Sequence, residues 1–156
     1  MSKPTEEGEA FTELVLEVFR LNGLLLQAGD RLTEPVGLSS ARWQVLGVVE
    51  HGPAPVANVA RIMGLTRQSV QQTADALARD GFVEYLENPH HRRAKLIALT
   101  PSGRKALDHV VESHAEWANR IAPAVKLQRL RAAVNALRQV RERLEQDAAS
   151  PPELEP

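Results

Sequence analysis

Residues 66–72, TRQSVQQ, bring together side chains that can form hydrogen bonds with the edges of DNA bases. If the segment is helical, one face carries an arginine and three glutamines, Arg67, Gln68, Gln71 and Gln72. An arginine can pair with two atoms of guanine, and a glutamine can pair with two atoms of adenine. The first turn carries no acidic residue, so the helix N-terminus is free to attract a phosphate. The alternative interpretation is an ordinary solvated face, although such a face more often carries pairs of Glu and Lys.

The residues around this segment predict a helix-turn-helix. Thr66 is a good N-cap for a helix that runs to about Arg79, and a shorter helix is expected at about 56–63. Two short helices joined by a three-residue turn with a glycine form this motif, and the second helix enters the major groove with its first residues. Thr66 and Ser69 add hydroxyl groups at that end, and Asp75 is expected to pair with Arg79. The motif makes base recognition the better interpretation of the polar face.

A β-hairpin is expected directly after this motif. Residues 82–87 and 95–99 are short β-prone runs, and the loop between them, NPHHRRA, is polar and basic. Arg92 and Arg93 are expected to reach backbone phosphates or a neighbouring minor groove. The alternatives are a solvated basic turn, or a wing in which one of the two arginines binds its own domain.

Longer helices are predicted towards both ends of the chain. Residues 10–32 and 126–147 have apolar residues at alternating spacings of three and four, a pattern typical of helices that pack on one another. Further helices are expected at about 39–51 and 101–121. The apolar seams either cover the core of one subunit or form a core shared by two. Arg141 interrupts the last seam, where it sets the register, pairs with an acid of a partner or reaches solvent.

The predicted fold class is mainly α with a small β-hairpin wing, a winged helix-turn-helix flanked by N- and C-terminal dimerisation helices. We expect an N-terminal dimerisation helix at 10–34, the DNA-binding domain at 38–100, C-terminal dimerisation helices at 101–147 and a disordered tail at 148–156. A two-fold dimer can place two recognition helices about one turn of DNA apart.

Composition restricts the classes of function. The net charge is −1, but residues 61–105 hold eight basic and four acidic side chains, so positive charge gathers around the motif. The absence of cysteine excludes disulfides and thiolate metal sites. The start, MSKPTEEGEAFTEL, lacks a signal-peptide pattern, and no apolar run approaches the roughly 18 residues of a membrane span, so a cytoplasmic location is expected. No phosphate loop, nucleophile elbow or HExxH motif occurs, so we expect no enzyme activity, cofactor or metal site.

Three stretches extend the motif into a longer pattern, namely ARWQVLGVVEHGP, VARIMGLTRQSVQQTADALARDGFVE and NPHHRRAKLIALTPSG. Through them, and over roughly residues 10–147, the chain resembles the multiple antibiotic resistance regulator (MarR) family of bacterial transcription factors. The resemblance implies a homodimer that binds a palindromic double-stranded DNA operator, usually as a repressor. The matching recognition-helix and wing positions are Thr66, Arg67, Gln68, Ser69, Gln71, Gln72, Arg92 and Arg93. In the family an aspartate commonly begins the wing and braces a tip arginine, whereas this chain has Asn88 there.

The resemblance also implies a small amphipathic ligand, often an aromatic acid, that weakens DNA binding. We expect its pocket where the first, second and fifth helices meet, with Trp43, His51 and Trp117 as candidate lining residues. The alternative for each of them is an ordinary core or surface position. The sequence therefore predicts a sequence-specific DNA-binding regulator, a repressor released by such a ligand. The alternative is a winged-helix protein-interaction adaptor without a DNA target.

Overall fold

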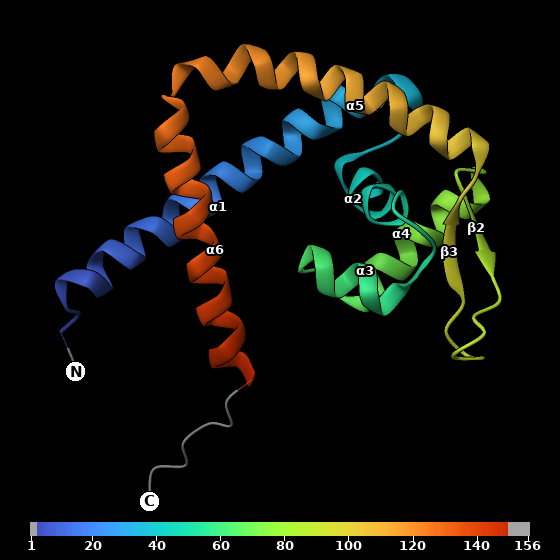
Figure 1. The fold of residues 1–156 in the computed structure, drawn as a ribbon, viewed down its shortest axis with the longest axis horizontal. Coiled ribbons are helices and arrows are strands. Elements are labelled where there is room, and N and C mark those ends of the chain that lie inside the picture. The colour runs from blue at the N-terminus through green and yellow to red at the C-terminus, as the bar shows by residue number, and fades with distance from the viewer. Residues whose placement is uncertain (1–2, 150–156) are drawn as a thin grey trace, which may run out of the picture. The chain divides into compact units, whose positions relative to one another are not determined.

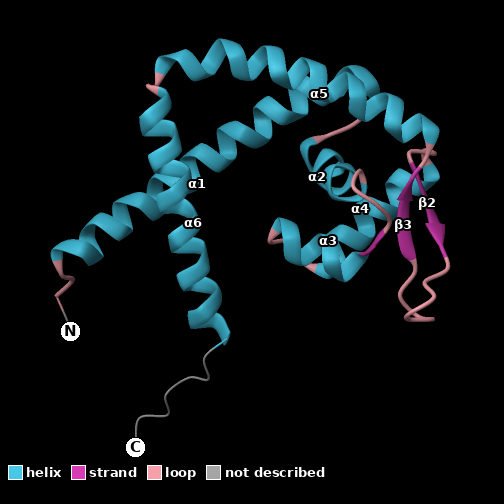
Figure 2. Cartoon of the chain, viewed as in Figure 1, coloured by secondary structure: helices cyan, strands magenta, loops and turns pink. Residues whose placement is uncertain are grey.

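The computed structural model describes residues 3–149, and Figures 1 and 2 show their helices and strands. In chain order these are α1 (Glu6–Thr33), η1 (Glu34–Val36), α2 (Ser40–Val49), β1 (Ala54–Pro55), α3 (Val56–Met63), α4 (Arg67–Arg79), β2 (Val83–Leu86), β3 (Leu96–Leu99), α5 (Pro101–Ile121), η2 (Ala122–Ala124) and α6 (Leu127–Ala149). The prediction of a mainly helical chain with a β-hairpin after a helix-turn-helix is confirmed. No helix in this part of the chain is long and apolar enough to cross a membrane. The predicted tail lies outside the described residues from position 150 onward.

Side-chain caps determine where several helices begin. Ser39 Oγ accepts a hydrogen bond of 3.3 Å from the amide three residues on, so α2 begins directly after Ser39. Thr100 Oγ1 accepts one of 3.1 Å from the amide of Gly103, which confirms the predicted start of α5. The first helix begins at Glu6, earlier than predicted, because Thr5 supplies a cap there.

The chain divides into two compact units, and the division falls within α5 rather than before it. The first unit ends at His114 and the second begins at Ala115. The first half of α5 belongs to the first unit because Ala106, Leu107 and Val110 are buried in its core. The winged helix therefore extends its core into helical residues beyond position 100.

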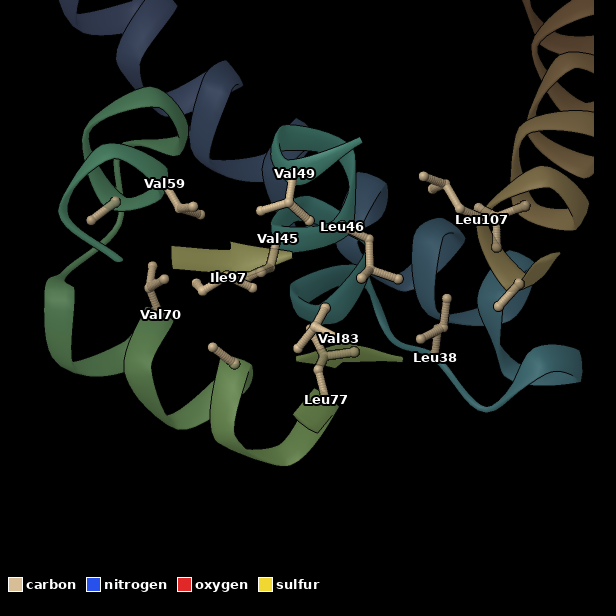
Figure 3. Close-up of a cluster of buried hydrophobic side chains, with 14 residues drawn as sticks. Leu38, Val45, Leu46, Val49, Val59, Val70, Leu77, Val83, Ile97 and Leu107 are labelled. Carbon is tan, nitrogen blue, oxygen red and sulfur yellow. The ribbon is translucent and has the colours of Figure 1, made fainter. Parts of the chain in front are cut away.

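The core of the first unit lies where α2, α3, α4, α5 and the sheet meet. Figure 3 shows side chains from each of these elements directed into one cluster. Its buried members are Leu38, Val45, Leu46, Val49, Val59, Ala60, Val70, Ala74, Leu77, Val83, Ile97, Ala106, Leu107 and Val110. Burial of each larger aliphatic side chain contributes roughly 1.5–3 kcal/mol. This cluster fixes the inner face of α4 against α2, α3 and β2.

The sheet has three antiparallel strands in the order β1-β3-β2. The predicted hairpin is confirmed, and its strands pair from Val83 opposite Leu99 to Leu86 opposite Leu96. The sequence analysis predicts no strand before the hairpin, but Ala54 pairs with Ile97 on the other side of β3. Two residues are too few to show alternation, and proline is compatible with an edge strand.

The end of α1 is held tightly to the start of α2. Ser40 donates its backbone N–H to Asp30 Oδ1 at 2.8 Å and its hydroxyl to the carbonyl oxygen of Leu26 at 2.6 Å. Gly29 permits this approach, because a Cβ there would overlap the Ser40 hydroxyl. The first helix is thereby anchored to the winged helix by its last turns.

Two ion pairs connect α2 with more distant parts of the first unit. Arg42 pairs with Asp80 at the end of α4 at 2.7 Å. Arg104 in the first turn of α5 pairs with Glu50 after α2 at 3.0 Å, and it also donates to the Glu50 carbonyl at 3.2 Å. Because these side chains are partly exposed, each pair stabilises the fold only modestly.

The second unit contains the end of α5, η2 and α6. No residue of α6 is buried within this chain, and the helix exposes Leu127, Val134, Leu137 and Leu144. Arg141, which interrupts the predicted seam, lies 3.7 Å from Glu142 and 3.8 Å from Glu145 of the same helix.

Gly103 lies where α5 packs against the base of the wing, and it provides a test of this packing. We expect Gly103→Ala to lower the free energy of unfolding by about 1–3 kcal/mol, since a Cβ would overlap the carbonyl oxygen of Phe82 and lie 2.8 Å from Leu99 Cδ1. Gly47→Ala in α2 is the matched control, because no atom lies within 4 Å of its added Cβ. Gly47→Ala is expected to raise the free energy of unfolding by up to about 1 kcal/mol, because alanine has the higher helix propensity. Urea denaturation measures both, and equal effects of the two substitutions would contradict the packing.

Candidate nucleic-acid interface

The two faces of α4 are separated as its periodicity predicts. Val70, Ala74 and Leu77 have no exposed surface. The six positions predicted to recognise DNA are all exposed, namely Thr66, Arg67, Gln68, Ser69, Gln71 and Gln72. Burial of one face therefore directs the other face of the helix to the surface.

The start of α4 is built by local hydrogen bonds. Gly64 adopts a φ of 65°, a left-handed conformation that glycine adopts without strain, and the chain turns there from α3 towards α4. Thr66 Oγ1 accepts a hydrogen bond from Ser69 N at 3.1 Å, and Ser69 Oγ donates to the Thr66 carbonyl at 3.0 Å. The predicted N-cap is confirmed. The Thr66 hydroxyl only accepts here, so its hydrogen can be donated to a phosphate.

Gln71 is exposed, but its amide is already hydrogen-bonded. Gln71 Nε2 donates to Asp75 Oδ1 at 2.9 Å and to Tyr85 Oη at 3.0 Å. Tyr85 Oη donates to the same Asp75 oxygen at 2.6 Å. Asp75 and Arg79 form no close ion pair within residues 3–149, since the carboxylate takes these two hydrogen-bond partners, and Arg79 contributes only a smaller charge attraction. The sequence analysis did not identify Tyr85 as a partner of α4. The only feature of the sequence that indicates this contact is the position of Tyr85 two residues after Val83, on the same face of the strand.

The protonation states of this group are well defined. The hydrogen bonds from Tyr85 and then from Gln71 lower the pKa of Asp75 below its ordinary value. Burial, followed by the hydrogen bond to Asp75, raises the pKa of Tyr85 well above its ordinary value. At neutral pH Asp75 is therefore a carboxylate and Tyr85 a neutral phenol.

A groove of about 660 Å³ lies between the start of α4 and the wing. Its polar lining comes from α4 and from the hairpin, namely Arg67, Gln68, Gln71, Tyr85, Arg93 and Lys95. The fold thus brings Arg67, Gln68 and Gln71 of the predicted recognition residues to the same concave surface as Arg93 of the wing. The other predicted residues are exposed but do not line this groove, namely Thr66, Ser69, Gln72 and Arg92.

The wing loop is held by Asn88. Its Nδ2 donates to the Ala94 carbonyl at 2.9 Å, and its Oδ1 accepts from the backbone of His90 at 3.0 Å. Arg92 and Arg93 are exposed and form no ion pair within residues 3–149. The loop therefore presents both arginines outward without binding either of them to its own domain.

Comparison with known proteins identifies the family. A model of the MarR family matches residues 36–94, from just before α2 into the wing loop. An uncharacterized protein of Mycobacterium tuberculosis is 38% identical over 133 residues, which cover 85% of this chain and 93% of that relative. The chain belongs to the MarR family. This is a family of DNA-binding transcriptional regulators with a winged helix, and the predicted resemblance is confirmed.

Two solved structures share the MarR fold with this chain. The transcriptional regulator MosR of M. tuberculosis, solved in complex with DNA, is 27% identical with a TM-score of 0.68, covering 83% of this chain and 96% of MosR. CouR of Rhodococcus jostii, solved with bound p-coumaroyl-CoA, is 26% identical with a TM-score of 0.67, covering 91% of this chain and 95% of CouR. The predicted fold class is thereby confirmed.

The wing of this MarR-family chain departs from the pattern that the resemblance implies. Asn88 stands where an aspartate commonly braces a tip arginine, and it carries no charge for such a bond. Its side chain closes the loop through the backbone instead. The loop shape is thus stabilised without neutralising a basic side chain.

Two of the three residues predicted to bind an effector line one apolar cleft of about 540 Å³. Trp43 and His51 lie there with Gln44, Gly47, Val48, Ile62 and Met63. The cleft is lined by residues of α2 and α3 and by His51, which follows α2. The expected effector pocket, where the first, second and fifth helices meet, stays a prediction. The first helix is fixed to the start of α2, where Ser40 binds Asp30. Trp117 belongs to the second unit and is not among the lining residues.

The fifth helix contributes to the surroundings of Trp43 within the first unit. The rings of Trp43 and His114 meet edge to face, with centroids 5.2 Å apart and planes inclined by 64°. This contact holds an aromatic side chain that also lines the cleft.

Proposed function

We propose that this MarR-family protein is a homodimeric repressor that binds a palindromic operator and is released by a small amphipathic ligand. The observation that carries the proposal is the groove that joins Arg67, Gln68 and Gln71 of α4 with Arg93 of the wing. We place its action in the bacterial cytoplasm, where such an operator lies. The proposal includes no catalytic activity.

The groove combines the two kinds of group that specific DNA binding requires. Positive side chains and the free N-terminal amides of α4 attract phosphates and set the register on the duplex. Amide and guanidinium groups of the outward face can contact base edges in the major groove. The solved complex of MosR with DNA supports this use of the fold.

The proposed dimer rests on apolar surface that one subunit leaves exposed. On α1, Phe19 is 69% and Leu24 is 63% exposed, and six further large apolar side chains are exposed: Phe11, Leu16, Val18, Leu21, Leu25 and Leu26. The last helix also exposes apolar residues along its length. Eight exposed large apolar side chains on one helix are uncommon on a monomer, and they favour burial of this surface by a second copy. A two-fold axis then presents two α4 helices about one DNA turn apart.

The proposed ligand site is the cleft lined by Trp43 and His51. It has the volume of a small-molecule pocket, aromatic and aliphatic walls, and polar groups from Gln44 and His51. The complex of CouR with p-coumaroyl-CoA supports an aromatic ligand for this fold. Our proposed ligand is a planar aromatic carboxylate, because apolar walls take the ring and the polar groups of Gln44 and His51 can donate hydrogen bonds to the carboxylate. Trp117 stays a predicted ligand contact.

The wing arginine Arg92 tests the DNA-binding part of the proposal. We expect Arg92→Ala to weaken binding to operator and random duplexes alike and to lower the slope of log K against log salt by about 1. Arg143→Ala, at an exposed position of α6 with no ion pair to any residue of 3–149, is the control and should leave the slope unchanged. Fluorescence anisotropy over a range of salt concentrations measures both. Salt-insensitive binding to a protein, with no affinity for duplex DNA, would instead favour the adaptor function.

Phe19 tests the proposed dimer. We expect Phe19→Asp to convert the protein to a monomer, because a carboxylate at the centre of an apolar interface is costly to desolvate. Gln27→Glu adds the same charge at another exposed position of α1 and should leave the dimer intact. Analytical ultracentrifugation distinguishes the two states. A wild-type protein that sediments as a monomer at micromolar concentration would rule out the dimer.

Gly47 tests the proposed ligand site. With salicylate and benzoate as probes, we expect release of wild-type protein from DNA, whereas Gly47→Leu should still bind DNA but resist release. The added side chain enters the cleft, where no atom lies within 4 Å of the new Cβ. Ala41→Leu, at an exposed position of α2 outside the cleft, is the matched control and should behave like wild type. Equal release of the two variants would place the ligand elsewhere.

A further inference from the structure

Three side chains from α4 and the wing form a compact hydrogen-bonded group beside the groove. Gln71 and Asp75 come from successive turns of α4, and Tyr85 comes from β2. Gln71 Nε2 lies 2.9 Å from Asp75 Oδ1 and 3.0 Å from Tyr85 Oη, and Tyr85 Oη lies 2.6 Å from the same Asp75 oxygen. We refer to these three residues as the Gln71 cluster.

Only one of the two hydrogens of the Gln71 amide is used within the cluster. The two acceptors lie 2.6 Å apart, on the same side of Nε2, so they share one hydrogen. The second hydrogen and the carbonyl oxygen Oε1 form no hydrogen bond within residues 3–149. The Gln71 amide therefore keeps one donor and one acceptor for a ligand.

The Asp75 carboxylate opposes reversal of this amide. A carboxylate can only accept, so Tyr85 donates its single hydrogen to Asp75, and the Tyr85 oxygen can only accept from Gln71. Rotation of the Gln71 amide by half a turn would place its carbonyl oxygen against these two acceptors. Hydrogen bonds from Tyr85 and Gln71 lower the pKa of Asp75, so the carboxylate persists at neutral pH. The amide nitrogen is therefore held towards Asp75.

The direction of the Gln71 amide matters because the bases differ in where they present donors and acceptors. In the major groove, adenine presents an amine where guanine presents a carbonyl, and cytosine presents an amine where thymine presents a carbonyl. A glutamine amide that can reverse offers either a donor or an acceptor at one point, so it tolerates both members of each pair. An amide of fixed direction offers only one of these groups there.

We propose that Asp75 is a positioning residue that fixes the direction of the Gln71 amide, so that the protein distinguishes amine-bearing from carbonyl-bearing bases at one operator position. This inference rests on the proposed DNA-binding function. Tyr85 supports the carboxylate from the wing, but the carboxylate alone excludes the reversed amide. Neither Asp75 nor Tyr85 needs to touch a base.

Two substitutions separate the carboxylate from the rest of the Gln71 cluster. In Asp75→Ala, the Tyr85 hydroxyl can accept from Gln71 Nε2 or donate to Gln71 Oε1, so both amide directions are allowed. We expect discrimination between amine and carbonyl bases to fall by roughly three- to tenfold, the value of one hydrogen bond. In Tyr85→Phe the carboxylate stays, so the discrimination should remain within about twofold of wild type.

The measurement uses the full-length protein and has two steps. Selection from a randomised duplex pool gives the operator motif, and the position read by Gln71 is the one whose preference is lost in Gln71→Ala. Fluorescence anisotropy then compares four duplexes that differ only at that base pair. The ratio of affinities between amine and carbonyl bases is the readout, because a uniform change in affinity does not alter it.

Glu84→Ala is the matched control for charge. Asp75→Ala removes a negative charge beside the groove, and Glu84 is an exposed acid on the same strand as Tyr85, with no ion pair to any residue of 3–149. Glu84→Ala makes the wing less negative but should leave the ratio unchanged. Asp75→Asn, whose own amide can reverse, also allows both directions of Gln71 and replaces Asp75→Ala if that variant does not fold. Circular dichroism verifies folding.

The outcomes distinguish this inference from the function on which it rests. If Asp75→Ala keeps the wild-type ratio, or if Gln71→Ala changes no position of the motif, the inference is wrong while DNA binding stands. If Tyr85→Phe loses as much discrimination as Asp75→Ala, the carboxylate alone does not fix the amide, and the inference is wrong as well. If wild type selects no motif, the proposed DNA-binding function fails, and the inference fails with it.

Discussion

The burial of one face of α4 is the constraint on which the rest of the interface depends. Val70, Ala74 and Leu77 have no exposed surface, and they hold the helix against α2, α3 and β2. Because residues advance by about 100° along a helix, this burial forces Arg67 and Gln68 outward. The Thr66 cap fixes the residue at which the helix begins, so the outward side chains and the free amides lie at the same end. Folding and recognition are consequently determined by one packing arrangement.

The same core positions the wing. Fully buried Ile97 belongs to the central strand β3, which pairs with β1 before α3 and with β2 of the hairpin. The strands are thereby fixed to the helices that flank α4, and Tyr85 reaches α4 from β2. Gly103 brings the start of α5 onto the Phe82 carbonyl at the base of the hairpin. A groove made of preorganised elements loses less entropy on binding than one made of mobile loops.

The features predicted from sequence are those that local chemistry determines. The start of α4 at Thr66, the start of α5 at Thr100 and the outward face of α4 depend on caps and periodicity within a few residues. Strand β1 was missed because its existence depends on pairing with Ile97, far along the chain. The Tyr85 contact with Gln71 was missed for the same reason, since it joins β2 to α4. The expected effector pocket, where the first, second and fifth helices meet, stays a prediction, because periodicity identifies apolar faces but not the faces that helix packing leaves open.

A net charge of −1 is compatible with DNA binding because of how the acidic groups are used. Asp80 is paired with Arg42 of α2, and Glu50, which directly follows α2, is paired with Arg104 of α5. By contrast, Arg67, Arg93 and Lys95 line the groove and form no ion pair within residues 3–149. Asp75 is the exception, since its carboxylate lies beside the groove and repels phosphates and base carbonyls. Its two hydrogen bonds moderate that repulsion but do not remove the charge. In the proposed complex with DNA, a retained negative group would lower the affinity for every duplex, and repulsion of this kind is one general means of gaining specificity at the expense of affinity.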